Sequence, residues 1–192
     1  MPETPKPRTR NANETKARII AAAQILFARK GYAQCSVKEI ADAADVAASL
    51  IIKHFGSKAE LFGAALISAL QHSPLTGVPK AEFATRLTDT LLGKNVQVLT
   101  PALTMAALED EEARQIAARV TRDYVLKPSA QWLGAPDADA RASYIMMISF
   151  GFAVFLRLFD QDVPGSVVKP TARWIAALFE DVINHPAPPD GA

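Results

Sequence analysis

The sequence is poor in the residues and runs that several classes of protein need. Its single cysteine, Cys35, excludes an internal disulfide framework among the 192 residues. One thiol suits a reducing compartment, so we expect a cytoplasmic protein. No run of 18 or more apolar residues occurs, which argues against a membrane partner. The first thirteen residues lack an apolar segment, so we do not expect them to be a secretory signal.

Motifs of common catalytic and cofactor sites are also missing. The sequence has no HExxH, Walker loop, GxGxxG or GxSxG, and no Cys/His cluster with zinc spacing. We therefore expect no enzyme, no metal and no other cofactor. A catalytic triad assembled only in space would escape this search, so an enzyme remains the third hypothesis.

Charge is unevenly distributed along the chain. Residues 1–60 hold ten basic and six acidic residues, a net charge of +4, whereas the remainder holds eleven basic and fourteen acidic residues, a net charge of −3. A basic N-terminal part is typical of a protein that binds nucleic acid, although a solvated charged surface would give the same count.

Two short segments predict helix starts of one design. Ser36 to Glu39 and Ser57 to Glu60 both read S-x-x-E, in which serine and glutamate cap each other's backbone N–H groups. A helix from Ser36 should end near Asp45, and a second short helix should run over about residues 47–54. Two short helices joined by such a turn predict a helix-turn-helix, whose second helix enters the DNA major groove.

Around this motif the chain resembles the tetracycline-repressor (TetR) family of bacterial transcriptional regulators. The resemblance covers about residues 15–67. It rests on Ala23, Phe27, Gly31, Tyr32, Ser36, Val37, Ile40, Ala41, Val46, Leu50, His54, Phe55, Ser57, Lys58 and Leu61. Three positions depart from the family pattern: Asp45 replaces a turn glycine, Ala47 replaces a capping Ser or Thr, and Ile52 replaces a phosphate-gripping tyrosine.

The predicted DNA-binding residues are those of the motif and its two helix starts. They are Ser36, Val37, Lys38, Ala47, Ala48, Ser49, Ile52, Lys53, His54 and Lys58. Ser36 and the three lysines should mainly hold phosphates, and the residues at 47–49 should face base edges. The two alanines can offer only methyl contact, for instance to thymine methyls, so Ser49 and either Lys53 or Lys38 should supply polar readout.

Three neighbouring features keep two interpretations each. Tyr32 is a packing aromatic or a phosphate contact. Cys35 is a packed residue rather than a reactive thiol, which would need exposure and a lowered pKa. Residues 1–13 should be a disordered tail, or a basic arm that touches DNA.

The rest of the chain reads as helical. We predict a DNA-binding domain over 14–70, a helical effector-binding and dimerisation domain over 71–186, and a loose tail over 187–192. The fold class is therefore all-α. Pro128 should kink or end one helix, and residues 164–170 should separate the last two.

Residues 144–159 are apolar nearly all round, which predicts a helix buried on every side, against the core and a second subunit. A membrane segment is the rival interpretation, but Arg157 and the short length disfavour it. The predicted homodimer interface comprises Phe152, Phe155, Trp174, Leu178 and Val182.

The resemblance also implies a pocket for a hydrophobic small-molecule effector. Candidates are Phe83, Leu87, Met105, Arg122, Tyr124, Met146, Met147 and Phe150, each of which could equally be plain core. Together these features predict a DNA-binding transcriptional regulator, a repressor that the ligand releases from a palindromic operator. The alternative is a ligand-binding protein of the same fold that has lost tight DNA recognition.

Overall fold

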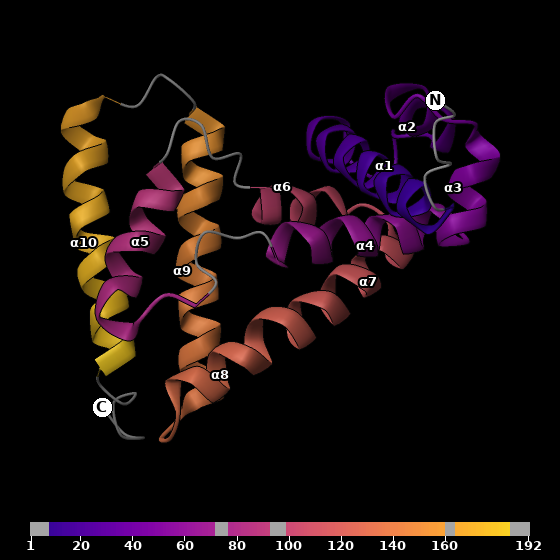
Figure 1. The fold of residues 1–192 in the computed structure, drawn as a ribbon. Helices are drawn as coiled ribbons and strands as arrows, with labels where there is room; N and C mark the ends of the chain where they lie inside the picture. Colours follow the sequence, from indigo (N-terminus) through magenta and orange to yellow (C-terminus); the bar gives the residue numbers. More distant parts are fainter. Residues whose placement is uncertain (1–7, 72–76, 93–98, 160–163, 185–192) are drawn as a thin grey trace, which may run out of the picture. The chain divides into compact units, whose positions relative to one another are not determined.

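The computed structural model describes residues 8–71, 77–92, 99–159 and 164–184. Within these ranges the chain is helical and has no β-strand, so the all-α prediction is confirmed (Figure 1). The elements are α1 (Arg8–Lys30), α2 (Val37–Ala43), α3 (Ala48–Phe55), α4 (Lys58–Gln71), α5 (Lys80–Leu92), α6 (Leu99–Ala106), α7 (Glu111–Thr121), the π-helical η1 (Arg122–Leu126), α8 (Lys127–Leu133), α9 (Ala138–Phe159) and α10 (Gly165–Asn184).

The chain forms two compact units that differ from the division expected at residue 70. The first unit contains the N-terminal helices and also residues 102–120, and the second contains the remainder. Two contacts explain why the later segment joins the first unit. The backbone N–H of Tyr32 donates to the carbonyl of Ala106 at 3.0 Å. Gly63 lets α4 approach α7, because a Cβ there would lie 3.0 Å from Cγ2 of Ile116.

Helix α1 begins earlier than the sequence pattern indicated. We expected residues 1–13 to be a tail, but the helix starts at Arg8, directly after Pro7. Residues 8–30 contain neither glycine nor proline and are rich in alanine, arginine and lysine, which favour helix. The remaining part of that tail, and the tail expected over 187–192, lie outside the described residues.

Three aromatic rings form the centre of the first unit. Phe27 of α1 stacks on Tyr32 with 5.6 Å between ring centroids, and Phe62 of α4 meets both rings edge-on, at 5.3 and 5.4 Å. All three residues are buried. Such ring pairs contribute about 0.5–1.5 kcal/mol beyond their buried area. They join α1, the loop after it and α4; α2 packs on α1, and α3 packs on α2.

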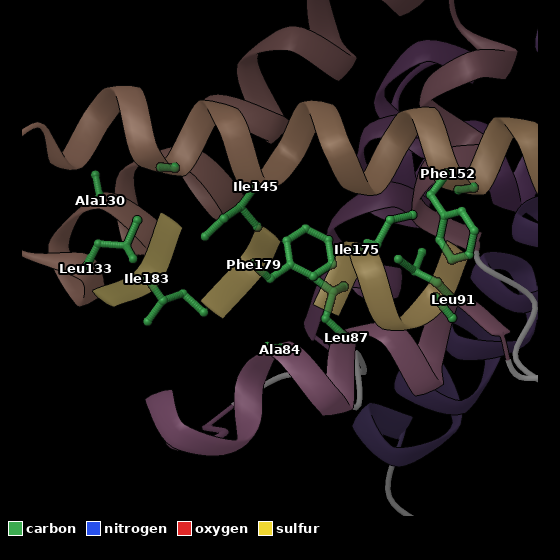
Figure 2. Packing of buried hydrophobic residues seen from close by; sticks show 13 residues of the cluster. Ala84, Leu87, Leu91, Ala130, Leu133, Ile145, Phe152, Ile175, Phe179 and Ile183 are labelled. Carbon is green, nitrogen blue, oxygen red and sulfur yellow. The ribbon is translucent and has the colours of Figure 1, made fainter. Parts of the chain in front are cut away.

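In the second unit α5, α9 and α10 run side by side, and α8 packs on α9 (Figure 1). Figure 2 shows Phe179 of α10 between Ile145 of α9 and Leu87 of α5. Phe179 has no exposed surface. The core of this unit is thus made by one face of each of these helices.

Two prolines are accommodated without breaking the helical path. Pro128 has no N–H, and its ring would clash with the carbonyl of Tyr124 in a regular α-helix. The α-helix ends at Thr121 and continues as the π-helical η1, where the N–H of Lys127 donates to the carbonyl of Arg122. The break expected over residues 164–170 was wrong. Helix α10 starts at Gly165 and contains Pro170.

Helix α9 is long and apolar. By length and mean hydropathy alone, residues 138–156 could cross a membrane, and 28% of that window is buried within the chain. The core helix of a helical domain passes the same test. Because α5, α8 and α10 pack on α9, we interpret it as a core helix rather than a membrane span.

Arg141 is a buried cation held by backbone carbonyls. The residue is 5% exposed. Its guanidinium donates to the carbonyls of Val182, at 2.8 Å, and Ile183 in the last turn of α10. It also donates to the carbonyls of Gly134 and Pro136, at 3.1 and 3.2 Å. The negative end of the α10 dipole favours a cation there, and four acceptors replace the water that burial removed.

Replacing Arg141 should destabilise the protein without changing its fold class. Arg141→Met removes four donors from buried carbonyls, and we expect the free energy of unfolding to fall by about 3 kcal/mol. Urea denaturation would measure the change. Arg86→Ala is the control, because Arg86 is exposed and its pair with Glu82 spans 3.4 Å. Equal stability of the Arg141→Met and control variants would contradict the role assigned to Arg141.

Candidate nucleic-acid interface

A complete capping box begins α2. The hydroxyl of Ser36 accepts the N–H of Glu39 at 3.1 Å, and the Glu39 carboxylate accepts the N–H of Ser36 at 2.9 Å. Lys30 of α1 lies 2.5 Å from the other carboxylate oxygen of Glu39. The hydrogen bond from Lys30, followed by those from Ser36, lowers the pKa of Glu39 to about 2. The predicted start of this helix is confirmed.

The turn between α2 and α3 depends on a left-handed residue. Asp45, where the family has glycine, adopts a φ of 52°. Aspartate tolerates this conformation better than most side chains. The N–H of Val46 donates back to the carbonyl of Ala41 at 3.0 Å and closes the turn. Ala47 then occupies the N-cap of α3 in an extended conformation, without a side-chain hydrogen bond.

Helix α3 has one buried and one exposed face. Ile51 is fully buried and anchors the helix, while Leu50, His54 and Phe55 are partly buried. The exposed side chains are Ala48, Ser49, Ile52 and Lys53. An eight-residue helix is marginal in isolation, so its stability comes from packing of the Ile51 face. The exposed face is left available for a partner.

Lys58 begins α4 beside the aromatic centre. The hydroxyl of Ser57 accepts the N–H of Glu60 at 3.0 Å. The ammonium of Lys58 lies over the ring of Tyr32, 4.1 Å from its centroid. Burial, followed by the charges of Asp110 and Glu112, raises the pKa of Tyr32 to about 12. Tyr32 is 4% exposed, so the packing interpretation of this residue is favoured over a phosphate contact.

Cys35 is equally enclosed. Its side chain is 1% exposed, and burial, followed by the charge of Glu39, raises the pKa of its thiol. Both features oppose the formation of a reactive thiolate. The structure therefore favours the packed-residue interpretation over a sensor.

Most of the ten predicted DNA-binding residues lie on the surface of α2, α3 and the start of α4. Besides Ser36, six of these residues have exposed side chains: Lys38, Ala47, Ala48, Ser49, Ile52 and Lys53. Val37, His54 and Lys58 are partly buried. Ser36 is exposed, but its N–H and hydroxyl both bond to Glu39. The polar groups of Ser36 are therefore engaged in capping α2.

Sequence reasoning missed the part of Lys30 in this arrangement. Lys30 and Glu39 are nine residues apart in the sequence, which matches no helical spacing, so no local pattern connects them. Only the packing of α1 against α2 brings them together.

The candidate ligand residues do not share one unit. Met105 belongs to the first unit and is 38% exposed, whereas the other seven belong to the second. Leu87 lies in the core, and Phe83 packs on Trp132 at 4.8 Å. Tyr124 and Met147 are exposed. Met146 and Phe150 are partly buried, and Arg122 is exposed on η1.

The candidate dimer residues divide in a similar way. Phe152 is 4% exposed and belongs to the core of its own chain, so it offers little surface to a second subunit, and its place at an interface stays a prediction. Its direction on α9 could not be read from a helix that is apolar all round. Phe155 and Val182 pack partly against this core, and Leu178 is partly buried. Trp174 is 64% exposed.

The lowered pKa of Glu39 predicts a pH dependence of stability. The charged carboxylate should stabilise the protein fully above about pH 5, and this contribution should be lost as the pH falls from 4.5 through about 2. The measurement is the difference in unfolding free energy between the wild type and Glu39→Gln, which keeps the cap but lacks the charge. Lys30→Met should weaken the same dependence. A difference that does not vary between pH 2 and pH 7 would contradict it.

Comparisons with known proteins agree with this geometry. Residues 19–65 match the family "Bacterial regulatory proteins, tetR family", and residues 81–183 match "Tetracyclin repressor-like, C-terminal domain". The HTH-type transcriptional repressor Rv3405c of Mycobacterium tuberculosis is 29% identical over 146 residues, which are 74% of this chain and 73% of that protein.

Two solved structures share the fold. A candidate TetR-family transcriptional regulator from Rhodococcus sp. has a TM-score of 0.73 and 17% identity, over 90% of this chain and all of that chain. The multidrug binding protein EbrR complexed with ethidium has a TM-score of 0.61 and 23% identity, over 89% of this chain and 99% of that chain. With a helix-turn-helix unit and a helical second unit that both match, this chain belongs to the TetR family of bacterial transcriptional regulators.

Proposed function

We propose that the protein is a dimeric repressor that binds a palindromic DNA operator and is released by a small-molecule ligand in its second unit. The observation that carries the DNA-binding part is the exposed face of α3. It presents Ser49 and Lys53 to solvent, and Lys38 is exposed on the neighbouring helix. The net charge of +4 over residues 1–60 favours the phosphate backbone. Such a role belongs in the bacterial cytoplasm.

The phosphate and base contacts would fall to different side chains. Lys38, Lys53 and Lys58 carry the charge that neutralises phosphates, and Lys58 stands at a helix N-terminus, which also favours anions. Residues 47–49 comprise the N-cap and first turn of α3, and in this motif the N-terminal residues of the second helix read base edges. Phosphate contacts set the register of the protein on DNA, and base contacts select the sequence.

Dimerisation is supported by the apolar surface of α9 and α10. Met147, Leu158 and Trp174 are 60, 74 and 64% exposed in the single chain, and Tyr144 is 39% exposed. A surface of large apolar side chains on two long helices indicates a protein partner. A second copy would cover it, and two recognition helices would then reach successive major-groove faces about 34–36 Å apart, or a multiple of that spacing.

A ligand would act by favouring one arrangement of the dimer. EbrR, a multidrug binding protein with a similar fold, was solved as a complex with ethidium. Met146 and Phe150 of this chain offer partly buried apolar surface in the second unit that suits a hydrophobic effector. Release from DNA requires that the ligand bind the non-binding arrangement more tightly.

Selection of bound duplexes from random DNA, followed by a salt titration on the winner, tests the function. A palindromic consensus with a steep salt dependence is the expected result. Absence of enrichment would favour the alternative, a ligand-binding protein of this fold without tight DNA recognition. The uncapped Ala47 would then be the first position to restore, by Ala47→Ser.

Lys58→Ala should weaken binding to every DNA sequence by a similar factor. Loss of one phosphate contact in each subunit should reduce the slope of log affinity against log salt concentration by about 2 per dimer. Titrations at several salt concentrations would measure it. Lys169→Ala is the control, because Lys169 is exposed on α10. A slope unchanged in Lys58→Ala would remove this lysine from the phosphate contacts.

Trp174→Glu should convert the dimer into a monomer, because it places a charge in the proposed interface. Analytical ultracentrifugation would measure the mass. Leu108→Glu is a matched control: Leu108 is 63% exposed, close to the 64% of Trp174, but lies in the first unit. The assignment fails if both variants sediment alike.

A further inference from the structure

The exposed face of the recognition helix α3 is divided by chemistry along its length. Residues four apart on a helix lie one above the other, so Ala48 and Ile52 form one edge of the face, and Ser49 and Lys53 form the adjacent edge. All four are exposed. One edge is therefore apolar and carries only methyl and methylene groups, and the other carries the hydroxyl and the ammonium.

Ile52 is the unusual member of this face. Its side chain is 49% exposed, while its neighbour Ile51 is fully buried and fixes the helix against the unit. A single exposed isoleucine is ordinary on a protein surface. Here Ala47 and Ala48 extend the same apolar surface by one turn toward the helix N-terminus, the end that meets the base edges in this motif.

The chemistry of DNA leaves one match for this edge. Ile52 has no donor, so it cannot hydrogen-bond to a phosphate as the family tyrosine does, and it cannot read guanine, adenine or cytosine through hydrogen bonds. The major groove presents a single apolar group, the C5-methyl of thymine. Exposed basic side chains at Lys38 and Lys53 flank the face and would hold it against the backbone.

We propose that Ile52, together with Ala48, reads thymine methyl groups in each operator half-site, so that Ile52 is a specificity-determining residue. This inference rests on the proposed operator-binding function. It assigns the apolar edge of α3 to the methyls and leaves hydrogen bonding to bases to the Ser49–Lys53 edge. The preferred half-site should accordingly contain thymines whose replacement by uracil weakens binding. Uracil pairs with adenine as thymine does but lacks the methyl group.

The experiment uses the full-length protein and the duplex selected from random DNA. Each thymine of the half-site is replaced by uracil, symmetrically in both halves, and the dissociation constant is measured. At contacted positions, loss of one buried methyl should weaken binding about fourfold per half-site, and about fifteenfold for the dimer. Thymines outside the contacted positions are internal controls and should show no change.

Ile52→Ala provides the matched variant. Position 52 is exposed and alanine favours helix, so folding should be retained. This variant should bind the thymine duplex more weakly than the wild type does. At one position, its ratio of affinity for the thymine duplex to affinity for the uracil duplex should fall most of the way to one. Ser49→Ala should keep that ratio while its preference elsewhere in the half-site changes. Ile52→Val, which keeps a branched apolar side chain, should restore most of the ratio.

The outcomes separate this inference from the function beneath it. Absence of any selected sequence overturns the operator-binding function and this inference with it. A selected operator that binds equally well with uracil at every position overturns only the methyl readout. So does a thymine-to-uracil ratio that is the same in Ile52→Ala as in the wild type.

Discussion

The first unit depends on the contact of three aromatic rings. Phe27, Tyr32 and Phe62 come from α1, the loop after it and α4, and their mutual packing joins these segments. Helix α2 packs on α1, and α3 packs on α2. The same ring of Tyr32 carries the ammonium of Lys58 on its face. A lysine side chain at a protein surface loses conformational freedom when its ammonium binds an anion. Because Lys58 already lies over a buried ring, part of that freedom is lost before any anion binds, which would favour the phosphate contact proposed for Lys58.

The recognition helix itself has little stability of its own. It is eight residues long, begins at an alanine without a side-chain cap, and follows a turn with aspartate in a left-handed conformation. An absent cap costs about 1 kcal/mol of helix stability. Burial of Ile51 offsets this loss by fastening one face to the unit. The neighbouring helix α2 buries Ile40 and Ala41 and has in addition a capping box reinforced by Lys30. Polar contacts therefore supplement apolar packing in α2, whereas α3 has no side-chain cap.

In the second unit the apolar residues outnumber the positions that one chain can bury. Phe179 and its neighbours fill the space between α5, α9 and α10, and Arg141 ties the end of α10 to the turn before α9. Large side chains such as Trp174 remain outside this core. Helix α9, which is apolar nearly all round, likewise buries Ile145 and Phe152 in this core and leaves Met147 and Leu158 exposed for the proposed second copy.

The helical class, the helix-turn-helix and the two serine-capped helix starts could be predicted from the sequence, because capping and helical periodicity are local properties of a few neighbouring residues. It also marked Lys38, Ser49 and Lys53 as surface positions of the motif. Other features could be found only in the folded structure, because they depend on contacts between residues far apart in the sequence. These are the pair of Lys30 and Glu39, the burial of Tyr32 and the inward direction of Phe152. The packing of residues 102–120 with the N-terminal helices belongs with them, since a close approach at Gly63 and a hydrogen bond from Tyr32 leave no periodic trace in the sequence.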